Sequence, residues 1–112
     1  MIAIIDYNAG NLRSIQKAVE LYSSNVVITN NPEVILSADK IILPGVGSFG
    51  SAMQNLSKEC NNQYTLKDVI CRAVKEVPFL GICLGMQLLM EVSEECGSSE
   101  GLGIIKGNVI KF

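Results

Sequence analysis

The sequence contains no histidine and no tryptophan, and it has neither a long apolar run nor a large charge excess. Histidine is the most common metal ligand, so its absence from these 112 residues leads us to expect no metal site. A net charge of −2 gives no reason to expect nucleic acid or an acidic membrane surface as a partner. No apolar run approaches the roughly 20 residues that span a bilayer, so we expect no membrane span.

Cysteine is present but is not arranged as a scaffold. Cys60, Cys71, Cys83 and Cys96 show neither C-x-x-C spacing nor the density of a disulfide-rich domain. The opening MIAIIDYNAG lacks a basic segment and reaches Asp6 too early for a signal peptide. The composition, 48% apolar and 18% charged, is that of one folded domain. A reducing cytoplasm is therefore the simplest compartment.

Short apolar runs alternate with amphipathic segments along the chain. We predict strands at residues 1–5, 26–28, 40–43 and 78–82, and helices at residues 12–22, 49–56, 65–74 and 83–92. This alternation implies right-handed βαβ crossovers and an α/β fold of three layers, a mostly parallel sheet with helices on both faces. The polar connection 58–64 is predicted to be a mobile loop, and the tail 101–112 a bent strand or hairpin.

The most informative stretch is VPFLGICLGMQLL, residues 77–89. Gly81 and Gly85 flank Cys83 at minus two and plus two, which is the pattern of a nucleophile elbow with cysteine in the serine position. Such a sharp strand-to-helix turn strains its central residue and crowds its flanks, so glycine is favoured there. The backbone N–H of Leu84 is expected to be unpaired and to face an oxyanion. The alternative is that Cys83 is a small buried apolar residue.

A second glycine-rich stretch, GVGSFG at residues 45–50, matches the G-x-G-x-x-G fingerprint of dinucleotide-binding proteins. That fingerprint belongs on the first strand–helix turn and needs an acidic residue at the end of the next strand, and this chain meets neither condition. We therefore expect no nucleotide cofactor. The glycines fit a backbone that approaches a ligand closely with its N–H groups free, and a tight turn without a ligand is the alternative.

Three loops should meet at the carboxyl edge of the predicted sheet, where ligands bind in such folds. These are residues 6–11, residues 44–50 and the elbow at Cys83. We expect them to form one site.

These motifs carry a resemblance. PGVGSFGSAM followed by VPFLGICLGMQLL resembles the class I glutamine amidotransferase family. Within it, the opening IIDYNAGNL and the tail GLGIIKGNVIKF are most similar to the glutaminase subunits of imidazole glycerol phosphate synthase. The resemblance covers nearly the whole chain. It implies that residues 1–112 are the N-terminal portion of a single amidotransferase domain, truncated at its C-terminal side.

The resemblance also implies an activity, the hydrolysis of glutamine to glutamate and ammonia through a cysteine thioester. It implies no cofactor, and a partner synthase (cyclase) subunit that uses the ammonia to make imidazole glycerol phosphate in histidine biosynthesis. It implies that Cys83 is the nucleophile. The N–H groups of Val46 and Leu84 would form the oxyanion hole. Glutamine would be held by Gly45, Gly47 and Gln87.

The chain departs from the family at the general base. Thioester chemistry needs a group that takes and returns a proton, normally histidine, and the family carries its His–Pro–Glu segment downstream of the matched region. We therefore expect the 112 residues alone to be inactive. Two alternatives remain open: a non-catalytic module that docks on a synthase, and a glutaminase for another acceptor such as a surface sugar. For Gln87, the spacing of four from Cys83 fits a solvated helix residue equally well.

Overall fold

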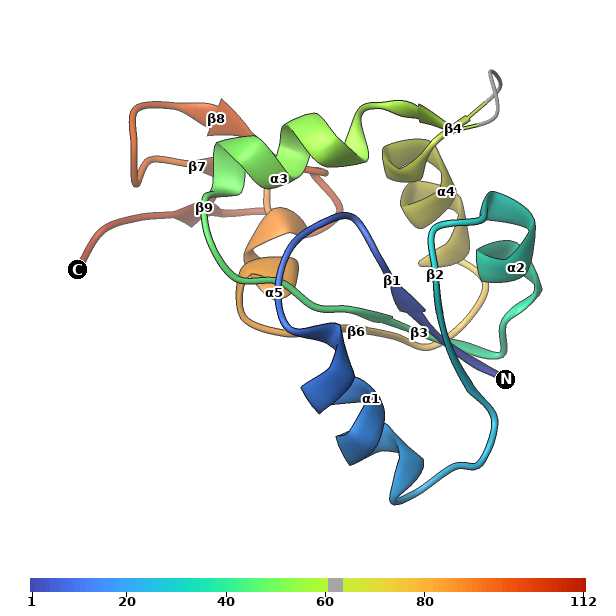
Figure 1. Ribbon diagram of the computed structural model, residues 1–112. Coiled ribbons are helices and arrows are strands. Elements are labelled where there is room, and N and C mark those ends of the chain that lie inside the picture. Colours follow the sequence, from blue (N-terminus) through green and yellow to red (C-terminus); the bar gives the residue numbers. More distant parts are fainter. Residues whose placement is uncertain (61–63) are drawn as a thin grey trace.

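The computed structural model describes residues 1–60 and 64–112. The helices of these residues are α1 (Leu12–Glu20), α2 (Pro32–Ser37), α3 (Phe49–Leu56), α4 (Leu66–Ala73) and α5 (Leu84–Leu88) (Figure 1). The strands are β1 (Ile2–Ile5), β2 (Val26–Thr29), β3 (Lys40–Leu43), β4 (Glu59–Cys60), β5 (Tyr64–Thr65), β6 (Phe79–Gly81), β7 (Val92–Ser93), β8 (Ser99–Glu100) and β9 (Asn108–Val109). The mobile loop predicted over 58–64 includes residues 61–63, which lie outside the described residues.

The central element is a four-stranded sheet in the order β2-β1-β3-β6. All of its neighbouring strands run parallel, with Ile4 opposite Ile42 and Ile42 opposite Leu80 in register. Its strands are continuous apolar runs, as expected where helices pack on both faces. The prediction of an α/β fold with a parallel sheet is therefore confirmed.

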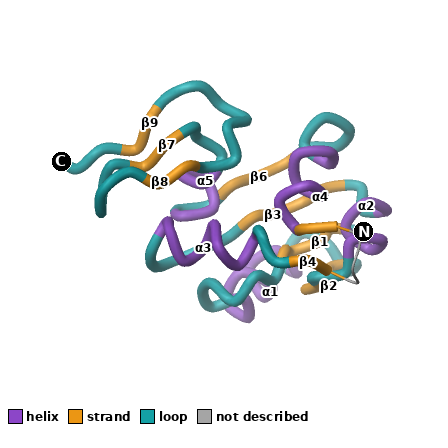
Figure 2. The backbone as a smooth tube through the Cα atoms, turned by 90° about the horizontal axis from the view of Figure 1, so that it is seen from above, coloured by secondary structure: helices purple, strands orange, loops and turns teal. Residues whose placement is uncertain are grey.

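Helices lie on both faces of this sheet (Figures 1 and 2). The larger core forms where alternate side chains of the strands meet α2, α3, α4 and α5. Its fully buried members are Ala3, Ile5, Ile35, Ile41, Leu43, Leu56, Ile70 and Leu88. On the opposite face, helix α1 packs beside β2. Every residue of α1 is described by the structure, and each one is half-buried or exposed. The sheet is thus covered fully on one face and partly on the other.

Several predicted boundaries were right because the capping residues are explicit in the sequence. Thr65 and Asp68 form a complete capping box at the start of α4, with each side chain bonded to the backbone N–H of the other. Ser48 caps α3 by accepting from the N–H of Ser51 over 3.4 Å. This second cap ends the loop that follows β3.

Other predictions were wrong. No helix was predicted at residues 32–37, yet Asn31 caps α2 through its side-chain oxygen, and proline suits the first helical position. Helix α1 ends at Glu20, so Tyr22 lies outside the helix and is exposed. Helix α5 ends at Leu88, because the chain then turns into β7.

The tail is not a hairpin of its own. The hairpin lies upstream, where β7 and β8 pair antiparallel, and β9 then adds to β7 in parallel. Gly107, with φ +131°, turns the chain, its carbonyl accepts from the N–H of Glu91, and its own N–H donates to that side chain. The tail therefore joins a small three-stranded sheet.

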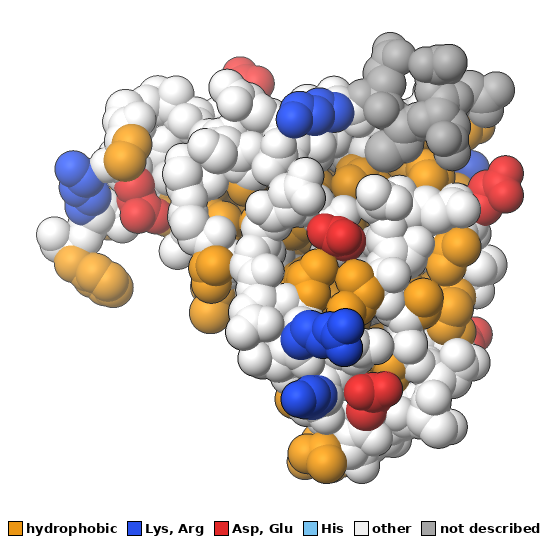
Figure 3. All heavy atoms as spheres, viewed as in Figure 1, with side chains coloured by type: hydrophobic (Ala, Val, Ile, Leu, Met, Phe, Trp, Pro, Cys, Tyr) orange, Lys and Arg blue, Asp and Glu red, His pale blue; other side chains and the backbone are white. Residues whose placement is uncertain are grey.

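The described residues contain no helix that is long and apolar enough to cross a membrane. On the face shown in Figure 3, charges of both signs are scattered among apolar side chains, and Lys and Arg do not gather into one patch.

Candidate active site

Cys83 lies between the end of β6 and the start of α5, with φ +54° and ψ −119°. A positive φ is sterically costly for a residue with a Cβ, so the surrounding structure must hold it in place. The thiol-bearing residue is exposed and is not part of a disulfide. The predicted strained strand-to-helix elbow is present, and the alternative that Cys83 is a buried apolar residue is wrong.

The two glycines beside the elbow are required by close packing of backbone on backbone. A Cβ on Gly81 would lie 2.8 Å from the Cα of Met86, at the first turn of α5. A Cβ on Gly85 would overlap the carbonyl oxygen of Leu43, the last residue of β3. The expectation that both flanking positions exclude side chains is confirmed. Helix α5 thus starts directly against the neighbouring strand.

The loop after β3 runs past this elbow. Gly45 is buried, whereas Val46 and Gly47 are exposed, Val46 with 63% of its surface accessible. Gly47 has φ +108°, a conformation that favours glycine. The loop therefore presents exposed backbone on the side where the chain leaves the sheet.

The three predicted loops do meet. The hydroxyl of Tyr7, from the first loop, donates to the carbonyl of Pro44 in the second. The N–H of Leu84, at the elbow, donates to the carbonyl of Gly45 over 3.2 Å. A Cβ on Gly10 would lie 3.5 Å from the backbone nitrogen of Val46. The convergence expected at the carboxyl edge of the sheet is confirmed by these contacts.

The bond between Leu84 and Gly45 corrects one expectation. The N–H of Leu84 was expected to be unpaired, but Gly45 lies so close to the elbow that its carbonyl reaches this donor. In a planar trans peptide the carbonyl of Gly45 and the N–H of Val46 point in opposite directions. The N–H of Val46 thus points away from Leu84, and within the described residues it has no hydrogen-bond acceptor. The two expected oxyanion donors do not face one point in this state.

Tyr7 was not singled out from the sequence. Its side chain is only 3% exposed, and burial raises the pKa of its hydroxyl to about 12. It therefore stays a neutral donor around neutral pH. The available signal was a large aromatic residue in an otherwise polar turn, DYNAGN.

Gln87 is half-buried on α5, and its backbone N–H donates to the carbonyl of Cys83 over 3.1 Å. Residues four apart share one side of a helix, so Gln87 lies one turn beyond the elbow on the same side. This position is compatible with binding a ligand at Cys83, and the role of Gln87 stays a prediction.

A polar hollow of about 140 Å³ lies between the start of α3 and the β7–β8 hairpin. Gly47 and Ser48 form one wall, and Ser93, Glu95 and Ser99 line the other. A carboxylate among hydroxyls and backbone groups is suited to an ammonium group. Sequence reasoning missed this hollow, because Glu95 stands in an acidic stretch that is indistinguishable from a solvated surface.

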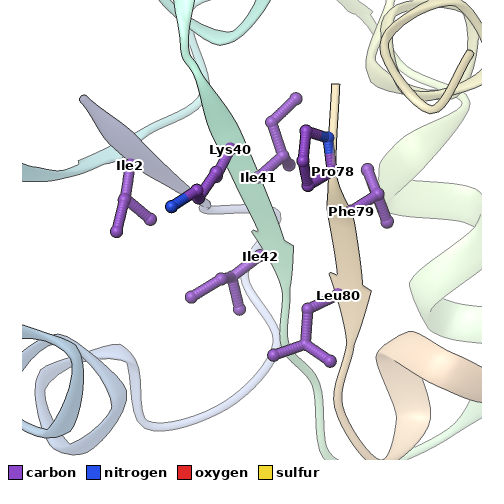
Figure 4. Close-up of a pocket in the computed structure, with 7 residues that line it drawn as sticks. All are labelled: Ile2, Lys40, Ile41, Ile42, Pro78, Phe79 and Leu80. Carbon is purple, nitrogen blue, oxygen red and sulfur yellow. The ribbon is translucent and has the colours of Figure 1, made fainter. Parts of the chain in front are cut away.

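A second hollow, of about 210 Å³, is apolar and lies on the sheet itself (Figure 4). Its walls are Ile2 from β1, Ile42 from β3, Leu80 from β6 and Pro78 just before β6, with Lys40 at its margin. It contains no residue of the elbow or of the loop after β3. We therefore assign no chemistry to it and treat it as the incompletely covered part of the sheet.

A strained, exposed cysteine lies at the carboxyl edge of a parallel sheet, beside a loop of exposed backbone, and this is an arrangement in which a thiol can reach a carbonyl group. Comparison with known families agrees. Residues 3–110 match the model of the family described as glutamine amidotransferase class-I, and the chain belongs to that family.

The chain is also similar to individual proteins of known name. It is 64% identical, over its whole length, to imidazole glycerol phosphate synthase subunit HisH 1 of Methanococcus maripaludis, of which it covers 55%. It is 67% identical to subunit HisH of Methanocaldococcus jannaschii, of which it covers 54%, and 51% identical to that of Sulfurimonas denitrificans, of which it covers 52%. The chain thus spans about half the length of the curated relatives it matches.

Proposed function

We propose that the chain is the nucleophile-bearing part of a glutaminase, a subunit that hydrolyses glutamine and passes ammonia to a synthase. The observation that carries this proposal is the geometry of Cys83, an exposed cysteine held at φ +54° between two glycines that tolerate no Cβ. The similarity to HisH subunits supports it further and points to imidazole glycerol phosphate as the product of the partner.

The proposed reaction has two steps. The sulfur of Cys83 attacks the side-chain amide carbon of glutamine, a C–S bond forms, and the C–N bond breaks as ammonia leaves with an added proton. Water then attacks the thioester carbon, the C–S bond breaks, and glutamate and the free thiol result. Each attack places negative charge on the carbonyl oxygen, and this charge needs N–H donors nearby.

The donors proposed for this charge are the N–H groups of Val46 and Leu84. The N–H of Leu84 now donates to the carbonyl of Gly45. The Gly45–Val46 peptide therefore has to rotate by about half a turn before the N–H groups of Val46 and Leu84 can both donate to the oxyanion. The same rotation releases Leu84 and turns the N–H of Val46 toward the elbow. The state described by the structure is, in this proposal, a resting state with the oxyanion hole closed.

The hollow beside the loop is proposed to take the amino-acid end of the substrate. The Glu95 carboxylate would pair with the α-ammonium group of glutamine, and the backbone at Gly45 and Gly47, with Gln87, would hold the rest of the molecule. A hollow of about 140 Å³ suits one small amino acid.

The general base is proposed to come from outside these 112 residues, which contain no histidine. In line with the resemblance, we propose that residues 1–112 form the N-terminal portion of one amidotransferase domain. We also propose a heterodimer with a cyclase subunit, located in the cytoplasm. One other function is compatible with these residues, a non-catalytic module that docks on the synthase.

The decisive experiment joins residues 1–112 to the part of the Methanococcus maripaludis relative that the chain does not match. Glutamate and ammonia released from glutamine are measured with and without Cys83→Ala. We expect this substitution to lower the rate by roughly 10³-fold or more. Cys71→Ala is the control, because this half-buried cysteine lies on α4, outside the site. Unchanged release in Cys83→Ala would refute the glutaminase proposal and leave the docking module.

A further inference from the structure

We infer that Tyr7 is a positioning residue for the oxyanion hole: its hydroxyl anchors the loop at Pro44, so that the Gly45–Val46 peptide alone can rotate. This inference rests on the proposed function of Cys83, and it gives a role to a buried hydroxyl that the reaction itself does not use. Tyr7 does not contact the reacting atoms, so it acts through the loop.

The first observation is the hydrogen bond itself. The Tyr7 side chain is 3% exposed, and its hydroxyl donates to the carbonyl of Pro44, the residue directly before Gly45. Tyr7 follows β1 and Pro44 follows β3, and these strands are neighbours in the parallel sheet. The anchor is therefore tied to the centre of the fold.

The second observation is steric. A Cβ on Gly45 would overlap the Tyr7 hydroxyl, and it would also lie 3.2 Å from the Cβ of Leu84 and 3.3 Å from the nitrogen of Gly85. Gly45 is thus enclosed by Tyr7 on one side and by the elbow on the other. The phenol touches the loop at the residue whose carbonyl closes the oxyanion hole.

These contacts divide the loop into a fixed part and a free part. The ring of Pro44 fixes its own φ, and Tyr7 holds its carbonyl, so the Pro44–Gly45 peptide cannot turn easily. Within the part of the chain that the structure describes, the next peptide is held only by the bond from Leu84 to Gly45, and Val46 beyond it is exposed. A rotation confined to one peptide brings the N–H of Val46 to a defined place. Without the anchor the whole loop can shift, and the donor is no longer positioned.

A purely structural role for Tyr7 makes a different prediction. If the hydroxyl only satisfies a buried carbonyl, its loss lowers the stability of the whole chain and affects all protected amides alike. If it anchors the loop, its loss acts first on the Leu84 N–H, the group that the loop covers. The test must therefore compare amides within the elbow.

The first measurement is amide hydrogen exchange by NMR on the 112-residue chain and on Tyr7→Phe. We expect exchange at Leu84 to rise about tenfold, the equivalent of one ordinary hydrogen bond, relative to exchange at Gly85. Gly85 is the internal reference, because its N–H donates to Ile82 within the elbow itself. Tyr22→Phe is the matched variant, since this tyrosine is 90% exposed and should change neither amide.

An unchanged ratio of Leu84 to Gly85 exchange in Tyr7→Phe would overturn the inference. Ile35→Val is a further control that weakens core packing away from the loop. It should raise hydrogen exchange at Leu84 and at Gly85 by the same factor. If Tyr7→Phe is too unstable in buffer, the same ratio is measured in sucrose, which favours the folded state without touching the loop.

The second measurement connects the anchor to chemistry at Cys83. A glutamine analogue with a chloromethyl ketone in place of the amide alkylates the sulfur after the thiol has lost its proton to solvent. A C–S bond forms at the chloromethyl carbon, the C–Cl bond breaks as chloride leaves, and partial negative charge builds up on the neighbouring ketone oxygen in the transition state. Methyl methanethiosulfonate reacts at the same sulfur through a new S–S bond with loss of methanesulfinate, and no carbonyl is involved. Both reactions are followed at Cys83 by peptide mass spectrometry.

We expect Tyr7→Phe to slow the chloroketone about tenfold and to leave the thiosulfonate rate unchanged. An equal effect on both reagents would overturn the inference. Failure of the proposed function gives a different result: wild-type Cys83 would then react equally fast with the L and D forms of the chloroketone. Preference for the L form with no effect of Tyr7→Phe would keep the function and remove the role of Tyr7.

Discussion

The N–H of Leu84 donates to the carbonyl of Gly45 over 3.2 Å, and this one contact joins the elbow to the loop that follows the neighbouring strand. It uses the donor that a nucleophile at Cys83 would need for its oxyanion. It also fixes the direction of the Val46 N–H, because the carbonyl of Gly45 and the N–H of Val46 belong to the same planar peptide. The contact therefore reports directly on whether the site is open or closed.

The first prediction follows from this contact. Alkylation of Cys83 by the chloroketone analogue should break the bond between Leu84 and Gly45, because the ketone oxygen competes for the same donor. We expect the amide signals of Leu84 and Val46 to move in ¹⁵N NMR spectra, while that of Gly85 stays in place. The methylthio adduct of Cys83, which has no carbonyl, is the control and should leave Leu84 bonded to Gly45. A chloroketone adduct with an unmoved Leu84 signal would contradict the rotation of the peptide.

The second prediction concerns the glycines of the elbow. Gly85→Ala should destabilise the fold by about 3 kcal/mol or more, because its Cβ would overlap the carbonyl of Leu43 and neither backbone can give way. Gly50→Ala is the matched control. Gly50 lies in α3, its Cβ would meet nothing closer than 3.6 Å, and alanine favours the helix by up to about 1 kcal/mol. Urea denaturation of the two variants checks this, and a similar loss in both would contradict the packing argument.

The sequence predicted well whatever depends on local patterns. The alternation of strands and helices, the capping box at Thr65 and Asp68 and the strained elbow at Cys83 were all recognisable, since each is written in neighbouring residues. Helix α2 was missed for a local reason too, because proline after asparagine can break a chain or start a helix.

What the sequence could not show was the state of the site. The closure of Leu84 by Gly45 and the anchoring of Pro44 by Tyr7 join segments that lie 37 or more residues apart. Such bonds depend on the conformations of the loops in the folded chain, and the hydrophobic periodicity of the sequence does not predict these conformations. Glu95 was missed because its acidic stretch resembles a solvated surface, and the loop at Gly47 that shares its hollow is far away in the chain.

The third prediction concerns alkaline pH. Burial raises the pKa of Tyr7 from 10.0 to about 12, so the folded state resists loss of this proton more than the unfolded state does. The resulting stabilisation is complete below pH 10 and is lost as the pH rises from about 10 to about 12. A shift of this size corresponds to roughly 3 kcal/mol.

Urea denaturation at pH 9 and at pH 11.5 tests this on the wild type and on Tyr7→Phe. The free energy of unfolding should fall more steeply with pH in the wild type, because Tyr7→Phe has no proton to lose at this position. Tyr22→Phe, which changes an exposed tyrosine, should follow the wild type. Parallel pH dependence in the wild type and Tyr7→Phe would contradict the assignment of the raised pKa to Tyr7.

The fourth prediction concerns the sheet face that α1 leaves open. Leu80 is 55% exposed beside Ile42 and Pro78, and they line an apolar hollow on the sheet (Figure 4). Strand β6 is also one of the two edge strands of this sheet in the described residues. An exposed apolar face next to an unpaired strand edge promotes association, so we expect the 112-residue chain to self-associate.

A charge placed within this face should weaken the association, because it would have to be desolvated in the contact. We expect Leu80→Lys to shift the chain toward the monomer in sedimentation velocity measurements, with little effect on folding since the side chain is already half in solvent. Leu21→Lys makes the same chemical change at the end of α1, where the leucine is 80% exposed outside the hollow, and should leave the association unchanged. If both variants dissociate equally, net charge and not this face controls the association. A wild-type chain that stays monomeric at high concentration would contradict the prediction that the exposed apolar face drives association.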